Sequence, residues 1–136
     1  MRNFLLIFTM LTTQVWAKGS VMIEDVIQDY FQGYQQADTK LIQNAFHADT
    51  RLLSVDNGKL DKTEMSDWLK SLEDRRLRGD IRKGILKIES IDATDYAASV
   101  KVNITFPAFA FTDYLSLLKI DGKWLIVGKI YHFKEI

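Results

Sequence analysis

The amino-acid sequence predicts an α+β fold, in which N-terminal helices pack on one face of a curved antiparallel sheet. Before Gly84, apolar residues recur at helical spacing, whereas after it they alternate with polar residues, as they do in strands. The dipeptide Asp121-Gly122 lies between two apolar runs and favours a type I′ hairpin. A length of 136 residues fits a single domain of this kind.

Residues 1–17 are predicted to be a secretory signal peptide rather than part of the fold. Arg2 supplies a positive start, an apolar run follows at 4–10, and Val15-Trp16-Ala17 has small residues where signal peptidase reads them. The run is shorter than the about 20 apolar residues that cross a bilayer. An uncleaved anchor or a buried N-terminal helix is the alternative. We therefore expect an exported domain of residues 18–136, either periplasmic or secreted.

The composition is that of an ordinary globular protein and excludes several chemistries. Eighteen basic residues balance 18 acidic residues, so no excess positive charge points to a nucleic-acid partner. There are no cysteines, which excludes disulfides, thiolate catalysis and cysteine-ligated metals. The two histidines cannot supply an all-histidine three-ligand metal site within one subunit. Neither a cofactor nor a metal is predicted.

Three helices are expected in the first half of the mature chain. Ser20 is predicted to cap the first helix, and Asp38 a short second helix. Asp61 and Glu64 have the spacing of a capping box and are predicted to open the third. The charge-rich stretch 73–83 is interpreted as a solvated loop that ends the helical half.

Five strands are expected from the alternating pattern and the turn residues that separate its runs. They are predicted at 51–55, 85–91, 95–106, 110–120 and 123–136.

The two-residue turn of the last hairpin also predicts which side chains share a face. Counting back from Asp121-Gly122 places Asp113 opposite Ile130. In this register Asp113 and His132 are diagonal neighbours on the same face as Trp124. We assign this face to the helices. Gly128, which has no side chain, is expected to leave a hollow beside the two polar residues.

The opposite face of the hairpin is predicted to form a homodimer interface. Helices can cover only one face, and contiguous exposed apolar area usually marks an interface. Lys129 is expected at the rim of this surface, with its charge in solvent. The apolar residues assigned to this face are Leu118, Leu125, Val127, Tyr131 and Phe133.

Several local strings resemble a known family. They are the stretch 30–46, the strand Thr112-Asp113-Tyr114-Leu115-Ser116-Leu117, and Asp121-Gly122-Lys123-Trp124-Leu125-Ile126 followed by Lys129. Over residues 20–133 the chain resembles the nuclear-transport-factor-2-like (NTF2-like) superfamily and, within it, the group named putative lumazine-binding proteins. The resemblance implies a cone-like roll with a pocket between helices and sheet, which commonly dimerises through the sheet. It implies no particular reaction.

The first functional hypothesis is a noncatalytic domain that binds a small molecule in this pocket. Aromatic walls would suit an aromatic heterocycle, and a few polar groups would orient it. For each aromatic residue, ordinary core packing is the alternative. The residues predicted to contact the ligand are Tyr30, Tyr34, Phe46, Trp68, Asp113, Trp124 and His132.

The second hypothesis is an acid–base enzyme, an isomerase or a dehydratase. His132 would move a proton near neutral pH, and Asp113 would orient it or act as the base. These two residues could instead form a purely structural pair. A metal site that adds His47 and Asp49 is a weaker idea, because no recognised ligand motif spans these residues.

Cleavage of the predicted signal peptide can be tested directly. Because the small-residue positions end at Ala17, mass spectrometry of the exported protein should find Lys18 as its first residue. An intact Met1 on protein recovered from the membrane fraction would contradict this prediction.

Overall fold

The computed structural model describes residues 10–136, with side chains from Met22 onward, and contains three helices and six strands within that range. The helices are α1 (Met10–Gln36), α2 (Thr39–Ala45) and α3 (Met65–Leu77). The strands are β1 (Arg51–Asp56), β2 (Lys59–Glu64), β3 (Ile85–Thr94), β4 (Ala97–Thr105), β5 (Phe109–Ile120) and β6 (Lys123–Glu135).

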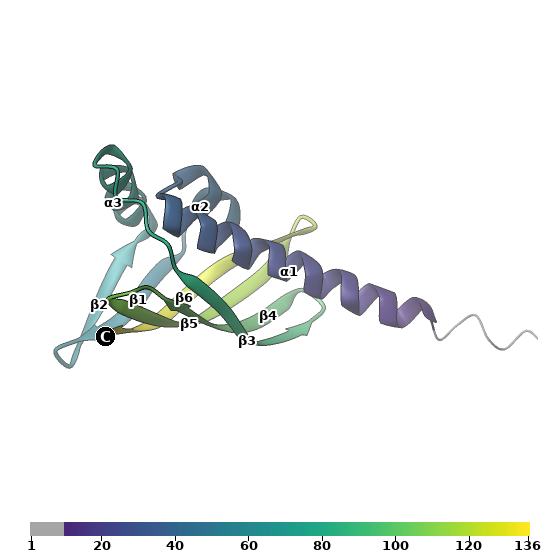
Figure 1. The fold of residues 1–136 in the computed structure, drawn as a ribbon. Helices are drawn as coiled ribbons and strands as arrows, with labels where there is room; N and C mark the ends of the chain where they lie inside the picture. The colour runs from purple at the N-terminus through teal and green to yellow at the C-terminus, as the bar shows by residue number, and fades with distance from the viewer. Residues whose placement is uncertain (1–9) are drawn as a thin grey trace, which may run out of the picture.

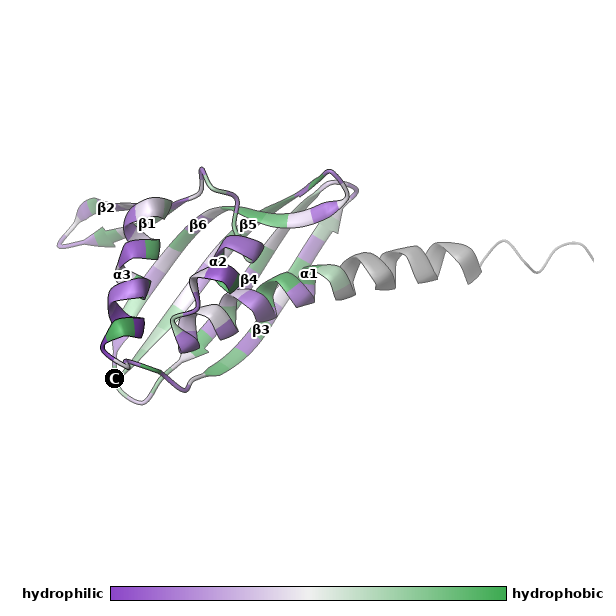
Figure 2. Cartoon of the chain, turned by 90° about the horizontal axis from the view of Figure 1, so that it is seen from above, coloured by the Kyte–Doolittle hydropathy of each residue, from purple (hydrophilic) through white to green (hydrophobic). Residues whose placement is uncertain are grey.

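The strands form one open, curved sheet that carries all three helices on the same side (Figure 1). Their order is β2-β1-β6-β5-β4-β3. Every neighbouring pair is antiparallel except β1 and β6, which run parallel. Viewed from above, α1 lies across the sheet, with α2 and α3 nearer the β1–β2 end (Figure 2). The predicted α+β fold is confirmed, with the addition of one parallel pairing.

Turn chemistry correctly predicts the last hairpin and explains an additional one. Asp121 and Gly122 have φ values of 50° and 78°, as a type I′ turn requires. Asn57 and Gly58, at 49° and 76°, repeat this geometry and join β1 to β2. Strand β2 is not predicted, because it lies at the sheet edge and its side chains are mostly exposed, so it lacks an alternating apolar pattern.

The helix starts are predicted with mixed success. Asp38 caps α2 as expected, since its Oδ1 accepts hydrogen bonds from the backbone N–H groups of Lys40 and Leu41 at 3.0 and 3.3 Å. The capping box at Asp61 is wrong, because Asp61 lies within β2. Helix α3 instead begins after Glu64, whose side chain makes no capping bond.

The first helix begins earlier than expected. It starts at Met10, so Ser20 lies inside it and is not its cap. Residues 1–9 of the predicted signal peptide lie outside the described residues, and cleavage stays a prediction. Among the residues that the structure describes, no helix is both long and apolar enough to cross a membrane.

The charged stretch 73–83 is not a solvated loop. Its first five residues complete α3, and Arg75 is buried against the end of α1. The Arg75 guanidinium donates to the carbonyl oxygen of Tyr34 at 2.9 Å and lies 3.5 Å from the Asp80 carboxylate. The length of arginine allows it to bridge the two helices from a sequence that looks entirely polar.

A β-bulge in β6 changes the predicted register of the last hairpin. Pairing follows the prediction as far as Leu117 opposite Ile126, but Ser116 then pairs with Gly128, so Val127 is an extra residue. Asp113 consequently lies opposite Tyr131. Because side chains alternate across a strand, one inserted residue exchanges the two faces of everything that follows it.

Because of the bulge, six residues lie on the opposite face from the one predicted. Lys129, Tyr131 and Phe133 share the helix side with Asp113, whereas Gly128, Ile130 and His132 lie on the outer face. Lys129 and Tyr131 are accordingly buried or half-buried, and Ile130 and His132 are exposed. The hollow at Gly128 is expected on the helix side beside Asp113 and His132, but the pocket of about 570 Å³ at Gly128 lies on the outer face, and neither of those residues lines it. Its lining includes Arg51, Leu53, Tyr114, Ser116, Gly128 and Ile130.

Two hydrogen bonds hold the backbone where the bulge begins. The carbonyl oxygen of Ile126 accepts from the backbone N–H of His47 at 2.8 Å and from the hydroxyl of Thr50 at 2.9 Å. Thr50 is fully buried. Immediately after the bulge, β6 pairs with β1, with Lys129 opposite Leu52. The connection between α2 and β1 therefore fixes the backbone of β6 at the bulge, along the edge of β6 that neighbours β1.

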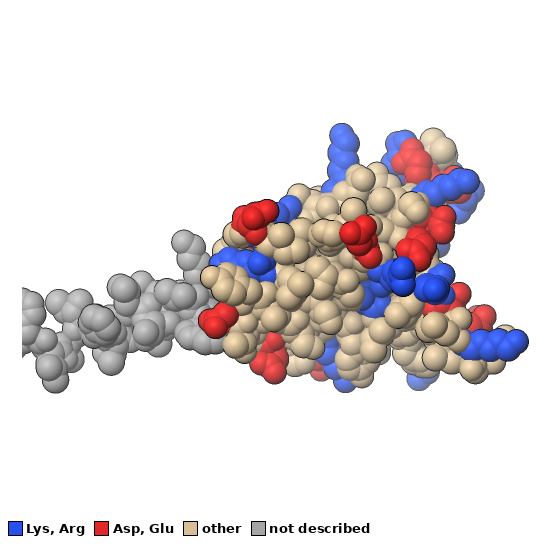
Figure 3. Space-filling model, turned by 180° about the vertical axis from the view of Figure 1, so that it is seen from behind, with Lys and Arg blue, Asp and Glu red and all other residues tan. Residues whose placement is uncertain are grey.

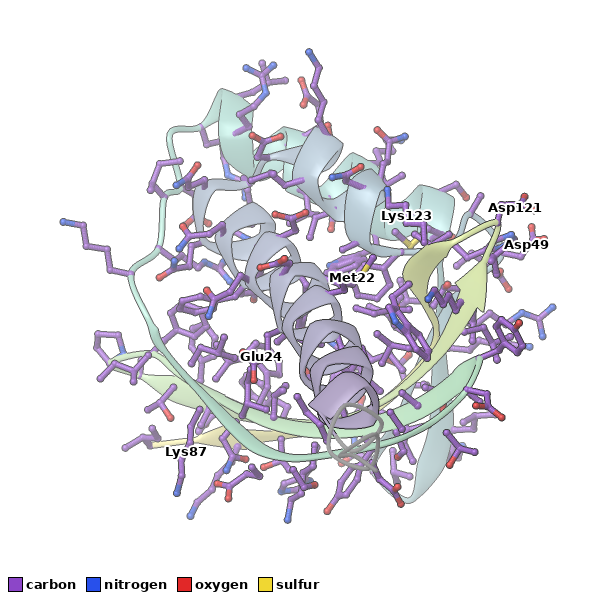
Figure 4. All side chains as sticks on the ribbon, turned by 90° about the vertical axis from the view of Figure 1, so that its right-hand side faces the viewer. Met22, Glu24, Asp49, Lys87, Asp121 and Lys123 are labelled. Carbon is purple, nitrogen blue, oxygen red and sulfur yellow. The ribbon has the colours of Figure 1, made fainter. Side chains whose placement is uncertain are left out.

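The hydrophobic core fills the space between α1 and the curved sheet. Looking along α1, its side chains meet those of the strands that curve beneath it (Figure 4). Among the largest fully buried side chains are Ile23, Ile27 and Tyr30 of α1 and Ile104, Leu115, Leu117 and Ile126 of the sheet.

Candidate functional site

Three polar side chains meet on the helix side of the sheet, inside this apolar core. Asp113 comes from the middle of β5, Lys129 from β6 after the bulge, and Tyr30 from the buried face of α1. The Tyr30 hydroxyl donates to Asp113 Oδ2 at 2.6 Å and accepts from Lys129 Nζ at 2.7 Å. Lys129 Nζ lies 3.3 Å from Asp113 Oδ2. We call these three residues the buried triad.

Burial controls the protonation of the triad. Removal from water lowers the pKa of Lys129, and the carboxylate of Asp113 opposes that change by favouring the ammonium form. Burial also raises the pKa of Tyr30 well above its ordinary value, and Asp113 adds to the increase through its charge and its hydrogen bond. Tyr30 therefore stays a neutral hydrogen-bond donor, while the lysine is easier to deprotonate than an exposed one.

Four aromatic rings surround the lysine ammonium group. Its Nζ lies 4.8 Å from the ring centre of Tyr131 and 4.9 Å from that of Tyr30. The rings of Trp68 and Phe111 lie 5.4 and 5.6 Å away. The negative faces of such rings attract a cation, each by about 0.5–2 kcal/mol. The ring faces offset part of the free-energy cost of removing the ammonium group from water, and they cannot themselves take up its proton.

Three buried side-chain polar atoms have no hydrogen-bond partner among the described residues. They are Asp113 Oδ1, the indole Nε1 of Trp124 and Nε of Arg75. A buried polar atom left unpaired costs about 1–3 kcal/mol, so such atoms in a native protein usually have a water or a ligand as partner. One carboxylate oxygen of Asp113 is thus in contact with Tyr30 and Lys129, and the other is free to accept a hydrogen bond or a proton.

The aromatic cluster continues from the triad towards solvent. Phe111 packs edge-on against Tyr131, and beyond it against Tyr34, with ring centres 5.9 and 5.7 Å apart. These three residues are only partly buried, and Phe133, 5.5 Å from Phe111, is 46% exposed. The triad is therefore one layer of rings away from this part of the surface.

Two arginines lie at the edge of this cluster. The guanidinium carbons of Arg75 and Arg82 lie 4.9 and 5.7 Å from the ring centre of Tyr34. Arg82 also donates to the Tyr34 hydroxyl at 2.8 Å, and both arginines pair with Asp80. The edge is thus rich in positive charge, although the one acidic partner neutralises part of it.

The structure brings most of the predicted contact residues together but separates one of them. Asp113, Tyr30, Phe46, Trp68 and Trp124 are buried in the common core, with Tyr34 half-buried at its edge. His132 does not join them. It pairs with Thr112 in the sheet, faces outward and is exposed, because the bulge reverses the alternation after Val127. The expected Asp113–His132 pair is therefore wrong, and Lys129 occupies the corresponding place.

Lys129 is the residue that the sequence reasoning missed, although the sequence contains a sign of it. Trp124 and Ile126 are in phase with each other, whereas Tyr131 and Phe133 follow the opposite phase. Such a change of phase within one strand is typical of a bulge. Lys129 shares the phase of the later aromatics, which would have placed it on the helix side.

The weaker metal hypothesis finds no support in this arrangement. His47 and Asp49 lie in the loop before β1, with Nδ1 and the carboxylate 3.9 Å apart, while Asp113 is inside the core and His132 on the outer face. Across the part of the chain that the structure describes, no three histidine or carboxylate side chains gather in a way that could hold a metal ion.

The family model described as "Putative lumazine-binding" matches residues 18–132. The chain belongs to this family. Solved structures agree on the fold. An NTF2-like protein of unknown function from Silicibacter pomeroyi has a TM-score of 0.77 at 18% identity, covering 87% of this chain and 98% of that one. Another from Shewanella baltica has a TM-score of 0.76 at 26% identity, covering 88% and 96%.

A named relative is also similar in sequence. It is a protein of Cladobotryum sp. named "Aldolase FrzH", which is 28% identical over 103 residues. The match covers 76% of this chain and 82% of the relative.

The buried triad makes a specific prediction about stability. Lys129→Met leaves the Asp113 carboxylate without its cation in the core, and loss of one partner of a buried pair typically costs about 3–5 kcal/mol. The double variant Asp113→Leu/Lys129→Met removes both charges and should cost much less than the sum of the single changes. The free energy of unfolding in urea measures both.

The exposed pair Lys87–Glu89 provides the control for that experiment. Because it lies near the surface, Lys87→Met should change the free energy of unfolding by no more than about 1 kcal/mol. Additive costs for Asp113→Leu and Lys129→Met would show that the two buried charges do not interact.

Proposed function

We propose that this domain binds a small carbonyl compound next to the buried triad and moves a proton to and from the carbon beside the carbonyl group. The observation that carries the proposal is the state of Asp113. One of its carboxylate oxygens is held by Tyr30 and Lys129, and the other is buried without a partner. A carboxylate fixed in this way can act as a general base.

The triad also provides what the resulting negative charge requires. An ammonium group has three N–H donors. In Lys129 one is donated to Tyr30, and a second lies against Asp113 Oδ2, which leaves a third for a carbonyl oxygen. Removal of a proton beside a carbonyl moves negative charge onto that oxygen, and a preorganised donor in a dry site stabilises it. Base and oxyanion donor would thus act side by side.

The comparisons support this reaction class without specifying a substrate. The family description favours a small-molecule ligand. The relative from Cladobotryum is named an aldolase, and aldol chemistry proceeds through removal of such a proton and formation of an enolate or enamine. Asp113 keeps the role of base that the second sequence hypothesis allowed it, and Lys129 replaces His132 as its partner, as a hydrogen-bond donor rather than as the group that moves the proton.

Noncatalytic binding of an aromatic heterocycle is the second candidate. The partly exposed rings of Phe111, Tyr131 and Phe133 favour it, since they form a surface on which a planar ligand could stack. In that case Asp113 would orient the ligand through its free oxygen. The two candidates use the same place in the fold and differ only in whether a proton leaves the ligand.

Solvent-deuterium exchange distinguishes the two. When simple aldehydes and ketones are incubated with the protein in D₂O, NMR should show loss of the proton signal beside the carbonyl, faster than in buffer. Asp113→Asn, which keeps the shape but removes the base, should reduce the exchange rate by about 10²–10⁴-fold.

A matched control and a direct binding measurement complete this test. Asp92→Asn, in β3 and exposed, should leave the exchange rate unchanged. Circular dichroism should show that Asp113→Asn remains folded. Binding of a pterin or another heterocycle, detected by ligand NMR in the absence of any exchange, would favour the noncatalytic candidate and contradict the proton transfer.

We also propose that the protein is exported and forms a homodimer through the outer face of the sheet. Tyr114, Leu118 and Ile130 are exposed there and uncovered by any helix. Charged side chains of both signs are scattered among neutral ones over the side of the molecule seen from behind in Figure 3. A sheet face with several uncovered large apolar residues favours a second copy as its partner.

Analytical ultracentrifugation tests the dimer. The mature domain should sediment at twice the monomer mass at micromolar concentration. Ile130→Glu, which places a charge in the proposed interface while leaving the core intact, should yield monomers. A wild-type protein that stays monomeric at high concentration would contradict the proposal.

A further inference from the structure

Lys129 is positioned against the usual preference of its residue type. Its neighbour Ile130 is 55% exposed, whereas Lys129 itself is 5% exposed. The bulge at Val127 exchanges the two, because an unbulged strand would place the isoleucine inside and the lysine outside. Bulges are common beside active sites, where they redirect a side chain. The local structure thus places an amine in the core at the expense of an apolar residue.

Burial shifts the amine towards its neutral, nucleophilic form, while the neighbouring carboxylate and aromatic rings oppose that shift. The rings of Tyr131 and Trp68 exclude water from Nζ, and burial lowers the pKa of Lys129. The Asp113 carboxylate, 3.3 Å away, is a proton acceptor within reach. The cation–π contacts and Asp113 hold the ammonium form until a proton is transferred. A buried lysine with these neighbours is of the kind that forms Schiff bases in proteins.

We propose that Lys129 is a covalent site, whose amine condenses with the carbonyl carbon of an aldehyde or ketone to form an imine. This inference rests on the proposed function and specifies its mechanism: Lys129 acts as a nucleophile, and the protonated imine replaces the ammonium group as the partner that takes up the negative charge. Lys129 first gives a proton to Asp113. The nitrogen lone pair then attacks the carbonyl carbon, the π electrons move to the oxygen, and Asp113 returns its proton to that oxygen.

The second half of the reaction completes the balance. One of the two protons on the nitrogen then passes, by way of Asp113, to the hydroxyl group, which leaves as water, and a protonated C=N double bond forms. One ammonium group and one carbonyl thus yield one protonated imine and one water, with no change in oxidation state. The protonated imine withdraws electrons more strongly than a carbonyl does. The free oxygen of Asp113 can then remove the neighbouring proton and leave an enamine.

Reductive trapping tests the covalent site. The full domain is incubated near neutral pH with propanal and sodium cyanoborohydride, which reduces an imine to a stable secondary amine. Peptide mass spectrometry then identifies the lysines that carry a propyl group. Lys129 should react faster than exposed lysines, by about tenfold for each unit by which its pKa is lower.

Lys101 is the matched internal control, because its Nζ also lies over an aromatic ring, 5.5 Å from the ring centre of Tyr114, but on the outer face of the sheet. Lys129→Arg keeps a cation beside Asp113 and should abolish the trapped product at this position. Lys101→Arg should leave trapping of Lys129 unchanged. Because the wild-type peptide map shows the relative rates directly, the outcome does not depend on folding of any variant.

Failure of the imine and failure of the proposed function give different results. Asp113→Asn should lose deuterium exchange but still allow Lys129 to be trapped, because removing the carboxylate removes the interaction that raises the pKa of the lysine. Exchange by the wild-type protein with Lys129 trapped no faster than Lys101 would overturn the imine and leave the proposed function standing. Selective trapping of Lys129 without exchange would uphold the covalent site and overturn the proton transfer.

Discussion

The extra residue at Val127 places a charged side chain, rather than an apolar one, in the core of this domain. Before it, β6 supplies Trp124 and Ile126 to an ordinary apolar core, and after it the same face receives Lys129 and Tyr131. The hydrogen bonds from His47 and Thr50 to the Ile126 carbonyl hold the strand where this change occurs. The chemical character of the site is therefore established in part by contacts to the backbone of β6 from residues outside the triad.

The triad illustrates how a protein retains charge in its core. Desolvation of Lys129 and Asp113 is compensated by their mutual attraction, by the Tyr30 hydroxyl and by the faces of four rings. Apolar residues of similar volume would pack at least as favourably in many proteins. The unpaired oxygen of Asp113 adds a further cost with no structural return. This combination is typical of a site maintained for binding or chemistry rather than for stability.

Local patterns in the sequence predict the fold class well and the site only in part. Helical spacing around Tyr30, the Asp38 cap and the Asp121-Gly122 turn each depend on nearby residues, and each is confirmed. The Asn57-Gly58 turn is a local sign of the β1–β2 hairpin, but β2 has no apolar pattern of its own, and the burial of Arg75 depends on tertiary contacts. The predicted register of the last hairpin is wrong beyond Val127, where one residue is inserted. This one error placed His132, rather than Lys129, on the same face as Asp113. Counting from a turn is reliable only as far as the first bulge.

The position of β6 has a consequence for how the domain folds. It is the last of the six strands in the chain, yet it lies between β1 and β5 in the middle of the sheet. The β1–β2 hairpin can join the sheet only through residues 123–135, which begin 59 positions after the hairpin ends, so a growing chain holds two separate sheet fragments until that segment is made. Contacts so distant in sequence slow folding and leave strand edges open meanwhile. Lys129 and Asp113 can therefore meet only after the segment that follows Gly122 has been made.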